Sequence, residues 1–121
     1  MSKRILVVED QADNRKIIRD MLRVTDYQIT EAEDGEQALE AIAKQRPDLI
    51  LMDIQLPIMD GYTATSRIKA DPALRSIPIT AVTSYALSGE EKKARAVGCD
   101  DYVPKPFSPR QLLAKIRQHL S

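Results

Sequence analysis

Long apolar runs are missing from this 121-residue sequence, in which no apolar stretch exceeds four residues. A transmembrane helix needs about 20 such residues in a row, and a signal peptide needs an apolar core, so both are excluded. The single cysteine excludes an internal disulfide and fits the reducing cytoplasm. The 18 basic and 18 acidic residues cancel, so net charge does not point to nucleic acid or a membrane as partner.

The apolar residues that are present form two short blocks, and each block ends in carboxylates. Ile5–Val8 precedes Glu9 and Asp10, and Leu49–Met52 precedes Asp53. A continuous apolar run of this length is typical of a central parallel strand that is buried on both faces. A charge at the end of such a strand is costly unless partners surround it, so Asp53 is the first candidate for a functional carboxylate.

Three further segments complete an alternation of strands and helices. Segment 27–32 alternates polar and apolar residues, which predicts a strand at the sheet edge, and segments 77–82 and 101–103 predict two more strands. Because a helical pattern follows each strand, we expect a parallel sheet with helices on both faces. With the apolar strands at the centre, the strand order is 2-1-3-4-5. This is a doubly wound, flavodoxin-like α/β fold with five helices, in a single domain over residues 1–121.

Polar residues mark the expected helix starts. Asp13 can cap the first helix, and Ser88 and Ser108 begin capping boxes for the fourth and fifth helices. The fourth helix closes at Gly98 and has a thin apolar face, so we expect it to be the most loosely packed. His119, in the last turn of the last helix, is expected to be solvated and favoured by the helix dipole.

Several strand ends bring polar residues to one edge of the predicted sheet. In such folds functional groups gather where the strand order reverses, which here is between strands 1 and 3. Glu9, Asp10 and Asp53 converge at that point, and Thr83 and Lys105 follow the fourth and fifth strands. Three adjacent carboxylates cannot all stay ionised without a cation. Oxygen ligands at this density predict Mg²⁺ as the cation.

A carboxylate beside Mg²⁺, facing an ammonium and a hydroxyl group, is equipped to accept a phosphoryl group. Asp53 is the better nucleophile candidate, since the Glu9–Asp10 pair is better placed to hold the metal. Taken one at a time, these residues also have structural interpretations: acid pairs form turns and caps, Thr83 can end a strand, and Lys105 can be a solvated turn residue. Their combination at one sheet edge favours the functional interpretation.

The same residues resemble a known family, the receiver domain of two-component response regulators. The similarity covers the whole chain, in order and at the family's spacings. It is carried by Ile5–Asp10, Leu51–Asp53, the residues Pro57, Met59, Asp60 and Gly61, then Ala81–Thr83, and finally Tyr102 with Pro104–Phe107.

The resemblance implies a phosphorylation-dependent signalling switch. Asp53 would accept a phosphoryl group from a histidine kinase or a histidine phosphotransfer protein. Mg²⁺ would be surrounded by Glu9, Asp10, Asp53 and the backbone carbonyl of Gln55. In the family, the side chain at the position of Gln55 also tunes hydrolysis of the phosphorylated state.

The resemblance further implies how the switch would act. Lys105 would bridge to the phosphoryl group, and Thr83 would move to bond it, which lets Tyr102 turn inward. The family usually makes the bond between Lys105 and Pro106 cis. Ser84 replaces the more common alanine and is still small enough to admit the phosphoryl group.

By the same resemblance the chain is not an enzyme that acts on small molecules, although it would assist its own phosphorylation and dephosphorylation. It would bind a downstream protein, as a monomer or weak dimer. One alternative is a receiver module cut from a hybrid kinase. Another is an aspartyl-nucleophile phosphatase, but phosphatases of the haloacid dehalogenase type need a second acid where this chain has Gln55.

Overall fold

The structure is a computed structural model, and it describes residues 3–83, 89–105 and 107–120. Strands and helices alternate strictly along these residues. The strands are β1 (Arg4–Val8), β2 (Gln28–Ala32), β3 (Leu49–Asp53), β4 (Ile79–Thr83) and β5 (Asp101–Pro104). The helices are α1 (Ala12–Leu22), α2 (Gly35–Lys44), α3 (Gly61–Ala70), α4 (Glu90–Ala96) and α5 (Pro109–Leu120).

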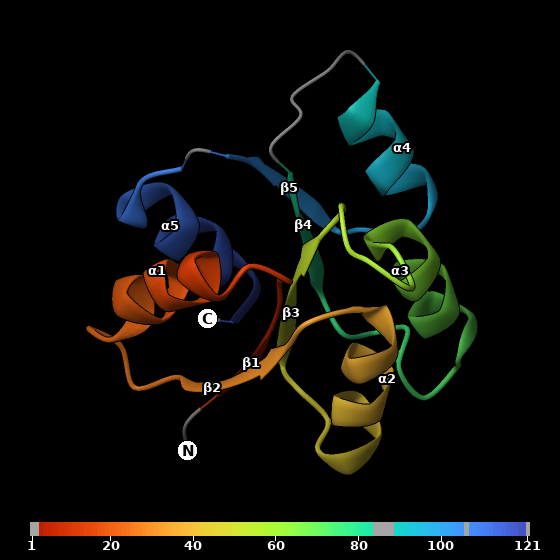
Figure 1. The fold of residues 1–121 in the computed structure, drawn as a ribbon, viewed down its shortest axis with the longest axis horizontal. Helices are drawn as coiled ribbons and strands as arrows, with labels where there is room; N and C mark the ends of the chain where they lie inside the picture. The colour runs from red at the N-terminus through yellow and green to blue at the C-terminus, as the bar shows by residue number, and fades with distance from the viewer. Residues whose placement is uncertain (1–2, 84–88, 106, 121) are drawn as a thin grey trace.

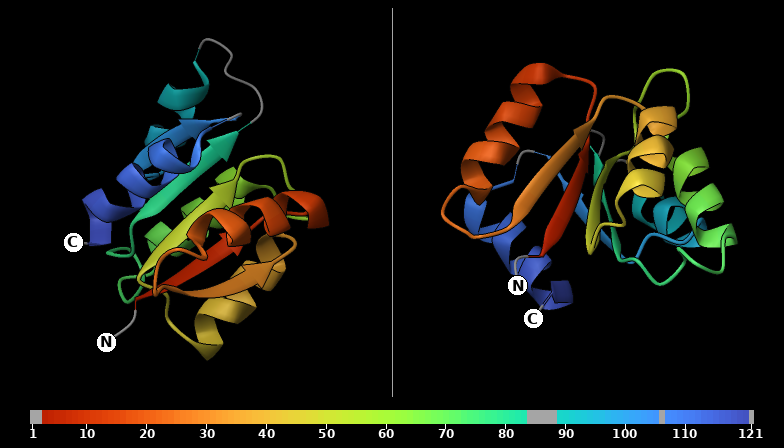
Figure 2. Two further views of the ribbon diagram at one scale, coloured as in Figure 1. Left: turned by 90° about the vertical axis from the view of Figure 1, so that its left-hand side faces the viewer. Right: turned by 90° about the horizontal axis from the view of Figure 1, so that it is seen from below.

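The strands form one parallel sheet in the order β2-β1-β3-β4-β5. Helices α1 and α5 cover one face of the sheet, and α2, α3 and α4 cover the other (Figure 1). The sheet is twisted, and all its strands run in the same direction (Figure 2). The predicted fold class and strand order are therefore confirmed, with β2 at one edge and β3 at the centre.

Alternate residues of the central strands contribute to two apolar clusters, one on each face. In β1, Ile5 and Val7 belong to the cluster that includes Leu112 of α5, whereas Leu6 and Val8 belong to the cluster on the opposite face. All of them are nearly inaccessible to solvent. Burial of each such side chain contributes about 2 kcal/mol. Both faces of β1 are buried from Ile5 to Val8, which explains why these four residues are all apolar while the edge strand β2 alternates.

The helix starts agree only in part with the predicted caps. The Ser108 hydroxyl accepts from the backbone N–H of Gln111 at 3.1 Å, and the Gln111 side chain accepts from the N–H of Ser108 at 2.8 Å, so this capping box is confirmed. The Asp13 cap is wrong: α1 starts two residues earlier, with Gln11 at the N-cap, and Asp13 lies in the first turn. The predicted cap at Ser88 lies outside the described residues, as do Ser84 and the Pro106 peptide bond.

Helix α4 is held to its neighbours mainly by polar contacts. Among the α4 side chains that the structure describes, Ala94 is buried and the others are exposed. The ammonium of Lys93 lies 4.5 Å from the centre of the Tyr62 ring in α3, a cation–π contact. Arg95 donates to the backbone carbonyl of Asp100 at 3.2 Å. The thin apolar face that the sequence predicts is thus present, and Gly98 ends this segment with a φ of 115°.

Candidate functional site

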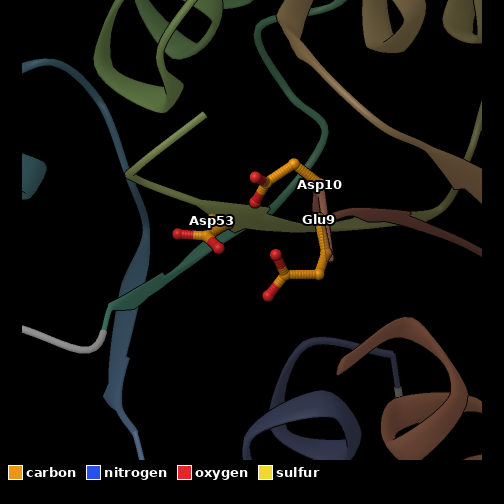
Figure 3. A group of neighbouring side chains, drawn as sticks. All are labelled: Glu9, Asp10 and Asp53. Carbon is orange, nitrogen blue, oxygen red and sulfur yellow. The ribbon is translucent and has the colours of Figure 1, made fainter. Parts of the chain in front are cut away.

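The ends of two central strands place three carboxylates together. Glu9 and Asp10 directly follow β1, and Asp53 is the last residue of the neighbouring strand β3. The β1–β3 register pairs Val8 with Met52, so the acid pair leaves the sheet beside Asp53. The three side chains point toward the same space beyond the strand ends (Figure 3). One ligand oxygen from each carboxylate lies within 4.8 Å of those of the other two.

This group of acids is only partly open to solvent. Glu9 and Asp53 are buried, at 1% and 6% exposure, and Asp10 is partly exposed. Buried anions at this separation repel one another strongly unless cations or hydrogen-bond donors compensate them. Backbone donors compensate part of the charge: the N–H of Gln55 donates to Asp53 Oδ1 at 2.9 Å, and the N–H of Gln11 donates to Glu9 Oε2 at 3.1 Å.

Lys105, just after β5, supplies a positive charge to the same space. Its Nζ lies 2.5 Å from Glu9 Oε1 and 3.3 Å from Asp53 Oδ2. Burial alone would lower the pKa of Lys105, but the hydrogen bond to Glu9 and the charge of Asp53 outweigh it, and the pKa is raised above its ordinary value. The ammonium is therefore charged at neutral pH and pairs with two of the three acids.

The loop between β3 and α3 brings the chain back against the end of β3. The N–H of Gly61 donates to the carbonyl of Ile54 at 3.0 Å, and a Cβ at Gly61 would lie 2.2 Å from the backbone oxygen of Asp53. Only glycine fits this approach. At the outer end of the loop, Ile58 has a φ of 65° and Met59 N–H bonds to the carbonyl of Pro57 at 2.6 Å, which forms a γ-turn. The loop thus leaves β3 at Asp53 and returns, at Gly61, to the backbone of the same residue.

Thr83 and Tyr102 lie on the strands next to the acid group. Thr83 ends β4, is fully buried, and accepts from the backbone N–H of Lys105 at 2.6 Å through its carbonyl. Tyr102 pairs with Ala81 in the β4–β5 register and is half-buried, with its ring packed against the apolar cluster under α4. The structure therefore brings Thr83 to the rim of the site and places Tyr102 on the neighbouring strand, against the same apolar cluster as Ala94 of α4.

A second ionic cluster was missed by the sequence analysis. Asp101, at the start of β5, is 4% exposed, and its carboxylate lies 2.8 Å from Lys115 Nζ and 3.2 Å from His119 Nε2, both in α5. Arg95 of α4 lies 3.7 Å away. The prediction that His119 is solvated is wrong, because α5 lies across the sheet and brings the imidazole against a buried acid. The only sequence signal is an acidic residue inside a predicted strand.

The carboxylate of Asp101 has a perturbed pKa. Burial alone would raise this pKa, but hydrogen bonds from Lys115, from the backbone N–H of Tyr102 and from His119 outweigh it, so the pKa of Asp101 lies below its ordinary value. A charged Asp101 therefore joins β5 to α5, and through Arg95 to α4. Asp101 directly precedes Tyr102 in β5, so these ionic contacts lie next to Tyr102.

The donor set at the strand ends is suited to a metal ion. Three carboxylates supply oxygen ligands, the type that Mg²⁺ prefers. Asp10 is the most exposed of them, so the group is in contact with solvent on the side of Asp10. Glu9, Asp10 and Asp53 could therefore hold a hard divalent cation. Within the described residues, no helix is long and apolar enough to cross a membrane.

Comparisons with known proteins identify the family of this chain. The response regulator receiver domain family matches residues 5–117. The polar-differentiation response regulator DivK of Brucella anthropi is 40% identical over 120 residues, which cover 99% of this chain and 98% of that protein. A putative response regulator from Chloroflexus aurantiacus has a crystal structure with a TM-score of 0.95 and 30% identity, and the match covers 99% of this chain and 98% of that one.

The structure of a third relative contains a magnesium ion. The receiver domain of a sensor histidine kinase from Pseudomonas aeruginosa PAO1 is 39% identical and has a TM-score of 0.91. The match covers 99% of this chain and 98% of that one. In that structure a magnesium ion is coordinated in the active site cleft. The present chain therefore belongs to the response regulator receiver domains, the phosphorylation-dependent signalling switches of two-component systems.

Proposed function

We propose that Asp53 is the residue that accepts the phosphoryl group. The observation that carries this proposal is the position of Asp53 at the end of the central strand, within reach of Glu9, Asp10 and the ammonium of Lys105. Glu9, Asp10, Asp53 and the backbone carbonyl of Gln55 would hold Mg²⁺. The ion would neutralise charge on the oxygens of the transferred group. No enzyme activity on other substrates is proposed.

The donor in this proposal is a phosphohistidine on a histidine kinase or a histidine phosphotransfer protein. A carboxylate oxygen of Asp53 attacks phosphorus while the bond from phosphorus to the donor imidazole breaks, and the imidazole leaves with the electron pair. Lys105 already lies between Glu9 and Asp53, so its ammonium can bind a phosphoryl oxygen without a long movement. Catalysis is therefore positioning and charge compensation by residues that the sheet already holds in place.

The output of this switch would be a change of the surface formed by α4 and β5. Thr83 is next to Lys105 through the bond of 2.6 Å between their backbones, so a phosphoryl group held by Lys105 also comes close to Thr83. A movement of Thr83 would change the packing of Tyr102 and of α4. Helix α4 can respond because Ala94 provides most of its apolar contact among the described side chains. A downstream protein would bind the changed surface.

We also propose a domain organisation, an oligomeric state and a location for the protein. We propose that residues 1–121 act as a single receiver unit, as a monomer or weak dimer. A cytoplasmic location is supported by Cys99, which is a buried free thiol. Like the aspartate, the other site groups would assist both the gain and the hydrolysis of the phosphoryl group.

Phosphorylation by a small donor tests the proposal without knowledge of the kinase. With acetyl phosphate and Mg²⁺, intact-protein mass spectrometry should show one added phosphoryl group on the wild-type protein. With EDTA in place of Mg²⁺ the adduct should be absent, because the three carboxylates would then repel the incoming phosphoryl oxygens. An adduct that forms equally well in EDTA would contradict the metal-dependent site, and the absence of any adduct would contradict the acceptor role.

A further inference from the structure

Arg15 of α1 connects three elements around the acid pair. One guanidinium nitrogen donates to the backbone carbonyl of Glu9 at 2.8 Å. The other two nitrogens contact carboxylates at and just beyond β2, at 3.1 Å from Glu31 Oε1 and 3.4 Å from Glu33 Oε1. The Arg15 side chain is 13% exposed and Glu31 is 25% exposed, so their contact is partly buried, whereas Glu33 is 59% exposed and its contact lies at the surface. The planar guanidinium can make several directed hydrogen bonds at once, which a lysine cannot.

The carbonyl of Glu9 is where this contact affects the site. The N–H of Glu9 still bonds to Ala32 in β2, at 3.0 Å, but β1 ends at Val8 and the carbonyl of Glu9 points away from the sheet ladder to Arg15. This carbonyl and the N–H of Asp10 belong to one planar peptide unit. A donor that fixes the carbonyl therefore fixes the direction in which the chain enters Asp10.

The anchor on the other side of Arg15 is also firm. Glu31 lies in β2, where pairing with Val7 of β1 fixes its backbone, and Arg19 adds only a more exposed contact, 2.7 Å from Glu31 Oε2. Arg15 thus connects a carboxylate on β2, which the sheet holds in place, to the peptide between Glu9 and Asp10. Such paired, charge-assisted hydrogen bonds are the strong and directional kind.

We propose that Arg15 is a positioning residue for the metal site: it holds the peptide between Glu9 and Asp10 so that both carboxylates face Asp53. Arg15 contacts neither the acceptor nor the transferred group. The inference rests on the proposed function, since it concerns residues that would hold Mg²⁺. It adds a residue whose role cannot be read from the acid cluster itself.

Charge and geometry make opposite predictions for the loss of Arg15. As a cation near the site, Arg15 repels Mg²⁺, so on charge alone its removal should strengthen binding of the ion. As a positioning residue, its removal should weaken binding, because the two ligands on the freed loop lose their fixed direction. Loss of a group that orients metal ligands typically weakens metal affinity by about 10-fold to 100-fold. The sign of the change therefore separates the two roles.

Isothermal titration of the full chain with Mg²⁺ tests the proposal. Arg15→Met, which keeps the length of the stem, should weaken Mg²⁺ binding by about 10-fold or more relative to wild type. Arg15→Lys keeps the charge but not the fork, and it should also weaken binding. The matched control is Arg19→Met, which removes a cation from the same Glu31 but makes no contact with Glu9. It should leave the Mg²⁺ affinity unchanged within about twofold, since Arg19 is exposed and screened.

Melting curves in EDTA show whether each variant is folded at the titration temperature. A purely structural role would lower the melting temperature of Arg15→Met and leave the Mg²⁺ affinity of the folded protein unchanged. Three results would overturn the proposal: an unchanged Mg²⁺ affinity of folded Arg15→Met, tighter Mg²⁺ binding by Arg15→Met, or an equal loss of Mg²⁺ affinity in Arg19→Met. If wild type itself does not bind Mg²⁺, the proposed function fails and this inference fails with it; normal binding by wild type and Arg15→Met alike overturns the inference alone.

Discussion

Replacing Asp53 with asparagine should abolish phosphorylation by acetyl phosphate and leave the fold intact. Asparagine has nearly the same shape as aspartate. Its side-chain oxygen can still accept from the N–H of Gln55, which in the wild-type protein lies 2.9 Å from Asp53 Oδ1. The amide is not a nucleophile that can form a stable acyl phosphate, so the effect on labelling is complete loss rather than a reduction. Mass spectrometry of wild type and Asp53→Asn after the same incubation with Mg²⁺ measures it.

The matched control for this variant is Asp60→Asn. Asp60 lies in the same connection between β3 and α3, and its side chain caps α3 by accepting from the N–H of Thr63 at 2.8 Å. Asparagine is an equally good cap, so this variant should fold and be labelled like wild type. Labelling of Asp53→Asn to the wild-type level would assign the acceptor to another residue. Loss of labelling in Asp60→Asn as well would show that the assay reports the loop rather than the acceptor.

Replacing Asp10 with asparagine should stabilise the metal-free protein and remove its response to Mg²⁺. Lys105 pairs with Glu9 and Asp53, and the hydrogen bond described for Asp10 is a 3.3 Å contact from the Gln11 side chain. The substitution therefore relieves repulsion among the three acids and leaves both contacts of Lys105 in place. A gain of about 1 kcal/mol would raise the melting temperature by roughly 4 °C in a domain of this size.

When Mg²⁺ is present, wild type rather than Asp10→Asn should be the more stable protein. An ion that binds only the folded state stabilises it by about 2.7 kcal/mol at 100 times its dissociation constant, so wild type should gain strongly. Asp10→Asn lacks one ligand and should gain little. Thermal melts of wild type and of Asp10→Asn, each in EDTA and in saturating Mg²⁺, give the four melting temperatures to compare. Asp13→Asn is the control, because Asp13 is an exposed acid in the first turn of α1 outside the cluster.

Two outcomes would contradict this account of the acids. One is a lower melting temperature of Asp10→Asn in EDTA, which would mean that Asp10 stabilises the metal-free fold. The other is a wild-type response of Asp10→Asn to Mg²⁺, which would mean that Glu9, Asp10 and Asp53 do not share one ion. An equal gain in Asp13→Asn would indicate a general effect of net charge.

The layout of the sheet and of the acid site could be predicted from sequence because both depend on backbone pattern. The continuous apolar run at Leu49–Met52 requires burial on both faces, and the alternation in 27–32 requires an edge, which together select the strand order. Once that order is fixed, the carboxyl ends of β1 and β3 are adjacent, and Asp53 meets Glu9 and Asp10 whatever their side-chain conformations.

The contacts that were missed depend on the reach of long side chains and on helix orientation. Arg15 bonds to Glu9 and Glu31, and His119 bonds to Asp101; the bonded residues are 6 to 18 positions apart in the chain and lie in different elements or loops. Sequence gives the spacing of a helix face but not its rotation over the sheet, so it did not show that α5 would place His119 over a buried acid. The start of α1 at Ala12, rather than after Asp13, was not foreseen because its N-cap residue, Gln11, makes no side-chain capping hydrogen bond.

We expect phosphorylation of Asp53 to control the surface of α4 and β5. Amide hydrogen exchange of wild type in Mg²⁺, with and without beryllofluoride as a mimic of the phosphoryl group, tests this most directly. The account predicts altered exchange between Thr83 and Val97 and at Tyr102, and almost none in α1, which packs on the opposite face of the sheet. Asp53→Asn should show no change under the same conditions. Equal changes throughout the chain, or no change around α4, would contradict the claim.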